Sequence, residues 1–128
     1  MEQGLYSRFS AWLDEVLSQE IPAEVVAFCF NLYEGEDGFY VQLIGAPAFD
    51  PEDSDWACDE AFSTGEEMFV LPHTQVGEDW ERGLAAAVEM VKAYLADGEQ
   101  AYVLRQAEGV AVGFVEGDLT VIRAQGAA

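Results

Sequence analysis

The chain has 128 residues, of which 51% are hydrophobic, and its 25 acidic and 5 basic side chains give a formal net charge of −20. This length and apolar content predict one domain over residues 1–128 with a core of its own, and they argue against a disordered chain. The charge argues against direct binding to nucleic acid or to an anionic membrane, because both need a surface rich in lysine and arginine.

The first predicted element is an amphipathic helix from Leu5 to Leu17. Its apolar residues recur at steps of three and four, with charged residues between them. Pro22 follows and ends the helical pattern. The face that we expect to pack on a sheet is made of Leu5, Phe9, Trp12, Leu13, Val16 and Leu17.

Two predicted strands follow, over residues 24–33 and 39–46. Both are rich in β-branched and aromatic residues, and residues 34–38 between them contain two glycines, which predicts a long hairpin. The first strand is apolar at nearly every position, as expected of a central strand that is covered on both faces. In the second, the period of two places Gln42 and Tyr40 on the wetter face.

Residues 47–67 have no regular pattern, and a second helix follows them. The irregular segment carries eight acidic residues around Trp56 and Phe62, and a short strand from Met68 to Leu71 comes next. The second helix is predicted from Glu78 to Ala96, with acids at its positive N-terminal end. Its predicted apolar face consists of Trp80, Leu84, Val88, Val91 and Leu95.

The last third of the chain is predicted to form a meander of three short strands. These run from Ala101 to Gln106, Val110 to Val115 and Leu119 to Arg123, with glycine-containing turns after the first two. The complete order predicts an α+β fold, with two helices packed on a mostly antiparallel sheet of five to six strands.

The sequence contains no motif of a known catalytic centre. The P-loop and the GxGxxG, GxSxG and HExxH patterns are all missing. The acidic segment 50–55 does not fit a calcium-binding EF-hand, because it lacks the glycine at the sixth position. Cys58 and His73 match no nucleophile–base signature that we can name. We therefore expect a protein that is not an enzyme and that uses no cofactor and no metal.

The location of the protein is predicted from two features. Residues 1–4 lack the basic and apolar regions of a signal peptide, and no apolar run approaches the 18 residues of a transmembrane helix. We therefore expect a cytoplasmic protein in which Cys29 and Cys58 are reduced thiols.

The charges are distributed unevenly along the chain. No lysine or arginine occurs over the 73 residues from 9 to 81, whereas 18 of the acidic residues fall there. Solvated surfaces usually mix both signs, and folding gains nothing from such an excess. We therefore predict a basic protein partner, which carboxylates attract and aromatic side chains anchor. The predicted contact residues are Tyr33, Glu34, Glu36, Asp37, Asp53, Asp55, Trp56, Asp59 and Glu60.

Two blocks of the sequence resemble a known class of proteins. FNLYEGEDGFYVQLIGAPAFDPEDSDWACDEAF (residues 30–62) and EGVAVGFVEGDLTVI (residues 108–122) look like parts of the small acidic immunity proteins of bacterial polymorphic toxin systems. The resemblance implies a cytoplasmic α+β protein that neutralises a cognate basic toxin, for example a nuclease, by stoichiometric binding.

Two alternatives stay open at this point. Acidic dimeric secretion chaperones share the order of helix, strands, helix and strands, but they usually close with a further helix, whereas this chain closes with the strand from Leu119 to Arg123. The second alternative is an enzyme that acts on a small cationic substrate. A pocket that holds a carboxylate of shifted pKa would favour the enzyme, and a flat acidic face would favour the inhibitor.

Overall fold

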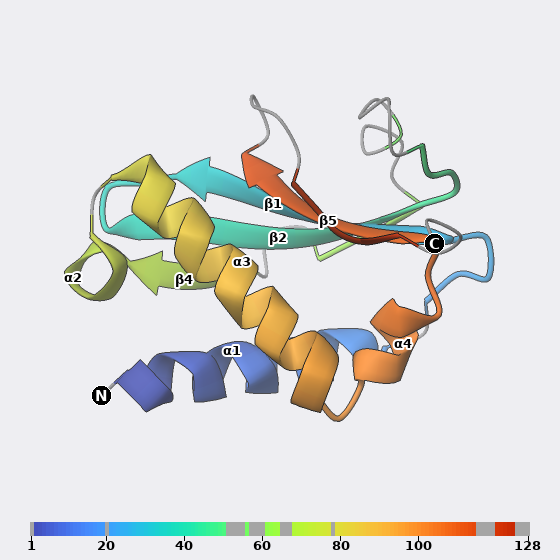
Figure 1. Cartoon of the computed structure of the whole chain (residues 1–128), viewed down its shortest axis with the longest axis horizontal. Helices are drawn as coiled ribbons and strands as arrows, with labels where there is room; N and C mark the ends of the chain where they lie inside the picture. The colour runs from blue at the N-terminus through green and yellow to red at the C-terminus, as the bar shows by residue number, and fades with distance from the viewer. Residues whose placement is uncertain are drawn as a thin grey trace.

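The computed structural model describes residues 2–19, 21–50, 56, 61–64, 68–77, 79–114 and 120–124. The elements follow one another as α1 (Glu2–Leu17), β1 (Ala27–Glu34), β2 (Gly38–Ala46), β3 (Phe62–Ser63), β4 (Phe69–Pro72), α2 (His73–Val76), α3 (Trp80–Asp97), α4 (Ala101–Arg105), β5 (Gly109–Phe114) and β6 (Thr120–Ala124). Figure 1 shows a twisted sheet with α1 and α4 below it and α3 crossing in front.

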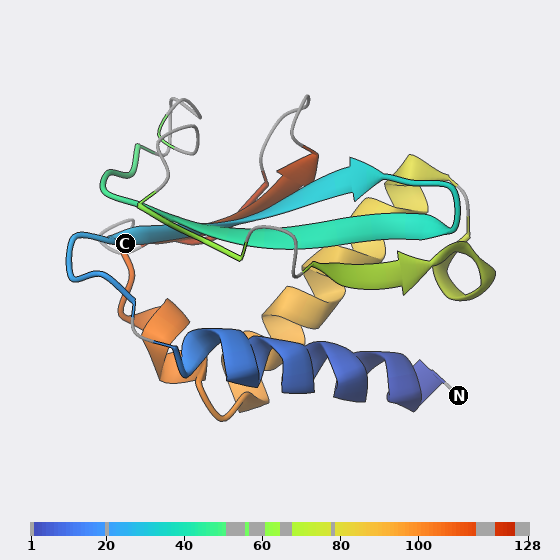
Figure 2. The same cartoon turned by 180° about the vertical axis from the view of Figure 1, so that it is seen from behind.

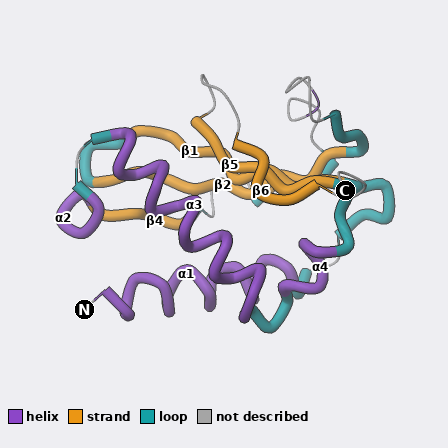
Figure 3. The backbone as a smooth tube through the Cα atoms, in the orientation of Figure 1, coloured by secondary structure: helices purple, strands orange, loops and turns teal. Residues whose placement is uncertain are grey.

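The described strands form one six-stranded sheet. Its order is β3-β2-β1-β5-β6, and β4 pairs with β2 beside β3. β1 lies at the centre, antiparallel to β2 and parallel to β5, and the remaining pairs are antiparallel. The tube in Figure 3 shows these strands lying together, with the helices on one side. The predicted α+β fold with a mostly antiparallel sheet is confirmed.

The helices share a core with one face of the sheet. Phe28, Phe30 and Leu32 of β1 point into this layer and contribute to the same apolar cluster as α1, α3 and α4. Figure 2 shows α1 running beneath the strands from the other side. Ala27 and Cys29 alternate with these residues and belong to a second cluster, as the period of two requires.

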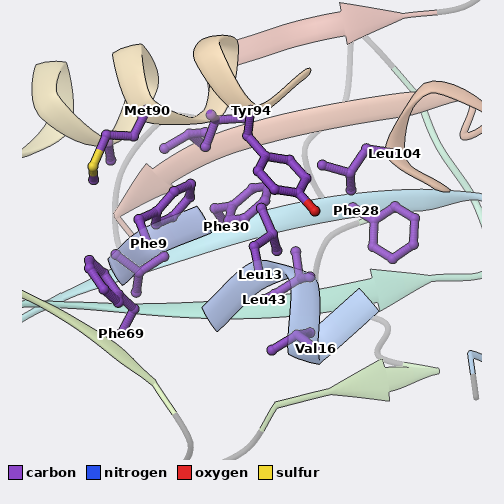
Figure 4. Packing of buried hydrophobic residues seen from close by; sticks show 14 of the residues in the cluster. Phe9, Leu13, Val16, Phe28, Phe30, Leu43, Phe69, Met90, Tyr94 and Leu104 are labelled. Atoms are coloured by element: carbon purple, nitrogen blue, oxygen red, sulfur yellow. The ribbon is translucent and has the colours of Figure 1, made fainter. Parts of the chain in front are cut away.

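α1 packs as its sequence predicts. Leu5, Phe9, Leu13, Val16 and Leu17 are at most 9% exposed. The ring of Phe9 meets Phe69 of β4 edge-on, with 5.4 Å between the ring centroids. Figure 4 shows Phe9 of α1 beside Phe30 of the sheet, and Leu13 and Val16 of α1 below Tyr94 of α3.

α3 turns inward a face that matches the predicted one in part: Val91 is fully buried, and Leu84, Val88 and Leu95 are partly buried against the core. Its buried residues are Gly83, Ala87, Met90, Val91 and Tyr94. Trp80 of the predicted face is 51% exposed. A side-chain carbon on Gly83 would lie 2.5 Å from the Phe39 ring, so the helix meets the sheet here without room for a side chain. Leu84 and Val88 lie beside this contact and are only partly buried.

The strand predicted from Ala101 to Gln106 is wrong, because α4 occupies this place. Ala101 and Leu104 are fully buried and three positions apart, whereas Tyr102 is 54% exposed. In a strand, Tyr102 and Leu104 would share a face. The Nε of Arg105 donates a hydrogen bond of 2.8 Å to the carbonyl of Leu95, which joins α4 to α3.

The helix at α4 also changes the topology that the meander predicted. The chain re-enters the sheet at β5, and β5 pairs parallel with β1, from Ala27 opposite Gly109 to Leu32 opposite Phe114. Parallel neighbours need a long crossover, and α3 with α4 provides it. The hairpin from β5 to β6 is antiparallel, as predicted.

Candidate functional site

The acidic turn between β1 and β2 carries three residues of the predicted site. The N–H of Gly35 donates to the carbonyl of Gly38 at 2.9 Å, which closes the turn. Glu34, Glu36 and Asp37 are all exposed on it. The turn therefore presents three carboxylates at the end of a long hairpin.

The same turn is fastened to the segment that follows β4. The N–H of His73 donates to the carbonyl of Asp37 at 2.9 Å, and the His73 ring meets Phe39 edge-on at 5.0 Å. Gly38 is required here, because a side-chain carbon at that position would lie 2.2 Å from the carbonyl oxygen of Leu71. The carboxylates of the turn are thus carried by a braced backbone.

The two aromatic residues of the predicted site differ in their places: Tyr33 directly precedes the turn, and Trp56 lies away from it. The hydroxyl of Tyr33 donates to Oε1 of Gln42 at 3.0 Å, so the half-buried ring is fixed across the hairpin. Trp56 is 5% exposed and packs edge-on against Phe49, with 5.1 Å between the ring centroids. A ring so deeply buried is a core residue, so the structure does not offer Trp56 as an anchor for a partner.

Trp56 and the turn also lie at opposite ends of β2. Trp56 packs in the cluster of Ala27 and Ala46, where β1 begins and β2 ends. The nine residues of β2 separate this place from the turn, which at about 3.3 Å per residue is roughly 26 Å. Asp53, Asp55, Asp59 and Glu60 lie outside the described residues. The structure therefore does not bring Trp56 together with Glu34, Glu36 and Asp37.

The start of α3 lies beside the turn instead. Oδ1 of Asp79 accepts the N–H of Glu81 at 3.1 Å and caps the helix. Glu81 suits this end, because the helix dipole is positive there. Gly83, one turn further on, packs on Phe39, which directly follows the β1–β2 turn. Figure 1 shows the hairpin tip, α2 and the first turn of α3 gathered at one end of the molecule.

We call this region the turn end and define it as residues 34–38, 73–76 and 79–82, all of which the structure describes. Its exposed carboxylates are Glu34, Glu36, Asp37, Asp79 and Glu81. The basic residue among them is Arg82, which is also exposed. Five carboxylates against one guanidinium make this end of the molecule strongly acidic.

Trp80 is the residue that sequence reasoning missed. We predicted it as part of the core face of the second helix, yet half of it is exposed. Its ring meets Phe114 edge-on at 6.0 Å, and Phe114 meets Phe39 at 5.7 Å. One signal was present: Trp80 stands between Asp79 and Glu81, in the first turn of the helix, where a core position is flanked by charge on both sides.

The cysteines and the possible metal ligands form no reactive site among the described residues. The thiol of Cys29 is buried and donates to Oδ1 of Asn31 at 3.2 Å. Cys58 lies outside the described residues, so the structure gives no geometry for a pair with His73. Within that part of the chain, no group of three or more histidine, cysteine, aspartate or glutamate side chains is placed to hold a metal ion.

Comparison with known proteins gives no identification. No protein-family model, no curated protein and no solved structure matches this chain. Among the described helices, none has both the length and the apolar character needed to cross a bilayer.

Proposed function

We propose that this chain is a non-enzymatic cytoplasmic protein that binds and neutralises a basic protein, in the manner of an immunity protein that inhibits a toxin such as a nuclease. The observation that carries the proposal is the distribution of charge. The net charge is −20, and at the turn end five exposed carboxylates accompany a single exposed arginine.

The mechanism is occlusion of a cationic surface. A nuclease holds its substrate with lysine and arginine side chains. The carboxylates of Glu34, Glu36 and Asp37 pair with such side chains and exclude the phosphates. Because the turn is held by the Asp37–His73 backbone hydrogen bond, its carboxylates meet the partner with little ordering of the backbone, which favours affinity.

Electrostatic steering is the second part of the mechanism. A strongly charged face raises the association rate of an oppositely charged partner, and salt weakens that effect. Dissociation depends on short-range contacts and responds less to salt. We therefore expect a fast and salt-sensitive association followed by a slow dissociation.

The test uses the protein encoded next to this chain, if it is basic and arrests growth when expressed alone. Co-expression with this chain should restore growth, and the two purified proteins should form a complex. Between about 0.05 and 0.5 M NaCl the association rate should fall by at least about tenfold. Growth arrest that persists on co-expression, or association at one rate in both salts, would contradict the proposal.

A matched pair of variants tests the turn itself. Glu34→Lys, Glu36→Lys and Asp37→Lys together change the net charge from −20 to −14. The control makes the same change at Glu15, Asp97 and Glu99, which are exposed and lie outside the turn end. The turn variant should slow association about tenfold more than the control. If both variants slow association equally, the total charge sets the association rate and the turn has no special part in it.

A further inference from the structure

A groove lies between α3 and β6, at the border of the core, where Leu84 and Val88 are partly buried. It has a volume of about 380 Å³. The residues that line it are Trp80, Glu81, Leu84, Ala85, Val88, Glu89 and Thr120. Three of its residues, Trp80, Leu84 and Val88, belong to the helix face that the sequence predicted.

The lining forms two parallel rows along α3. Trp80, Leu84 and Val88 are spaced by four residues and make an apolar row. Glu81 and Glu89 stand beside them, eight residues apart, which at 1.5 Å per residue is about 12 Å along the helix. No lysine or arginine is among the described residues that line the groove. The groove is therefore apolar along its floor and acidic at its side.

Trp80 is held in a defined position within this groove. Its ring stands nearly perpendicular to Phe114, at 84° and 6.0 Å between centroids. Phe114 is in turn fixed edge-on by Phe39. A half-exposed tryptophan that is supported in this way loses little freedom on binding, and tryptophan is among the commonest residues of binding hot spots.

The other wall of the groove belongs to an edge strand. Among the described strands, β6 pairs with β5 alone. Thr120 and Val121 are exposed on it, Val121 by 38%. An edge strand presents unpaired N–H and C=O groups, to which an extended peptide can add as a further strand.

We propose that this α3–β6 groove binds an extended segment of the basic partner, with an arginine or lysine side chain over Trp80 and apolar side chains against Leu84 and Val88. A cation over an indole face is attracted by the ring, and the carboxylates of Glu81 and Glu89 attract the same charge. A nucleic acid or an anionic lipid would be repelled by those carboxylates. A second copy of this chain also carries −20 and is repelled.

The inference rests on the proposed function and adds a second contact surface to it. Trp80 belongs both to the turn end and to the groove, so the two surfaces are continuous. The turn supplies carboxylates for steering, and the groove supplies the desolvated contact that slows dissociation.

The test measures binding of a defined probe, a nine-residue peptide of alternating arginine and leucine with blocked ends, by anisotropy of an attached dye. Trp80→Ala should weaken binding by at least about tenfold, as expected of a hot-spot residue. Glu81→Gln with Glu89→Gln should weaken it several-fold more than Glu15→Gln with Glu99→Gln, which removes the same charge elsewhere. The peptide with glutamate in place of arginine should not bind.

A second readout locates the probe without any substitution. The chain has three tryptophans, and 5-fluorotryptophan gives each its own ¹⁹F resonance, assigned by Trp80→Phe. The arginine–leucine peptide should shift the Trp80 resonance and leave those of Trp12 and Trp56 in place. Because this measurement uses the protein without Trp80→Ala, it locates the probe even if circular dichroism shows that variant to be unfolded.

The outcomes separate this inference from the proposed function. Binding that is unchanged in Trp80→Ala and in the Glu81/Glu89 variant, or a probe that leaves the Trp80 resonance in place, overturns the groove. The toxin co-expression experiment is independent of the peptide. Rescue of growth by a variant with Trp80→Ala, at the wild-type dissociation rate, would keep the function and reject the groove.

Discussion

At the scale of single residues, the hydroxyl of Tyr94 connects three segments. It donates to Oδ1 of Asp14 on α1 at 2.5 Å and accepts the N–H of Gln100 at 3.1 Å. The side chain is fully buried. Burial first, and then the hydrogen bond to Asp14, raises the pKa of the Tyr94 hydroxyl well above its ordinary value of 10.0. The neutral phenol is therefore the form that the folded state requires.

Tyr94→Phe is expected to lower the free energy of unfolding by about 1–3 kcal/mol, because Asp14 loses a donor and Gln100 an acceptor. The difference is fully present below pH 10, where the phenol is neutral in both the folded and the unfolded chain. Above pH 10 the tyrosine of the unfolded wild type ionises while the folded one does not, which stabilises the unfolded chain, so the advantage of the wild type shrinks.

Urea denaturation of both proteins between pH 7 and pH 11 checks this expectation. Tyr102→Phe is the control, because Tyr102 is 54% exposed. A difference between wild type and Tyr94→Phe that stays constant to pH 11 would disprove the link to ionisation.

Gly38 offers a second prediction at this scale. A side-chain carbon there would lie 2.2 Å from the carbonyl oxygen of Leu71, which is backbone within β4 and has little room to move. Gly38→Ala should therefore cost about 1–3 kcal/mol, as other overpacked sites do. At Gly35 the nearest atom is a ring carbon of Tyr40 at 3.0 Å, so Gly35→Ala should cost less. Thermal unfolding of the two variants compares them, and an equal loss would count against the close approach of β2 and β4.

At the scale of elements, α4 shows how neighbours select a structure. Ala101–Leu104 is a short apolar run, which suits a helix and a buried strand equally well by pattern. The hydrogen bond from Arg105 to the carbonyl of Leu95 and the burial of Ala101 and Leu104 favour the helix. Both are contacts with other elements, so no local pattern could predict the outcome.

The helix at α4 predicts unequal effects of two substitutions. Leu104→Ala should lower the free energy of unfolding by about 2–5 kcal/mol, as other buried leucines do. Tyr102→Ala should lower it by less than about 1 kcal/mol, because Tyr102 is exposed. Chemical denaturation measures both. A strand would place the two side chains on one face, so similar losses would speak for the strand.

At the scale of the whole molecule, the acidic excess opposes folding. A domain of this length has a radius of gyration near 14 Å, under two Debye lengths at physiological salt. Carboxylates on different sides of the molecule therefore repel one another, and compaction brings them closer. A basic partner would relieve this repulsion.

Salt should therefore stabilise the isolated protein. We expect its melting temperature to rise as NaCl increases from low salt to about 0.15 M, because screening weakens the repulsion. The slope should be smaller in a control with Glu15→Gln and Glu99→Gln, which carries two fewer charges. Chloride is used because sulfate strengthens apolar burial by itself. A melting temperature that stays flat or falls would show that repulsion is not a significant term.

The sequence by itself determined the fold class, the long helices, the hairpin from β1 to β2 and the central place of β1. These depend on periodicity and turn residues, which act over a few positions, and the acidic character depends on composition alone. Only the tertiary structure decided the helix at α4, the parallel pairing of β5 with β1, the buried place of Trp56 and the exposure of Trp80. Each of these depends on how closely elements distant in sequence approach one another. Gly83 against Phe39 is the clearest case, because the helix meets the sheet there without a helix side chain between them, whereas Trp80, three positions earlier on α3, is 51% exposed.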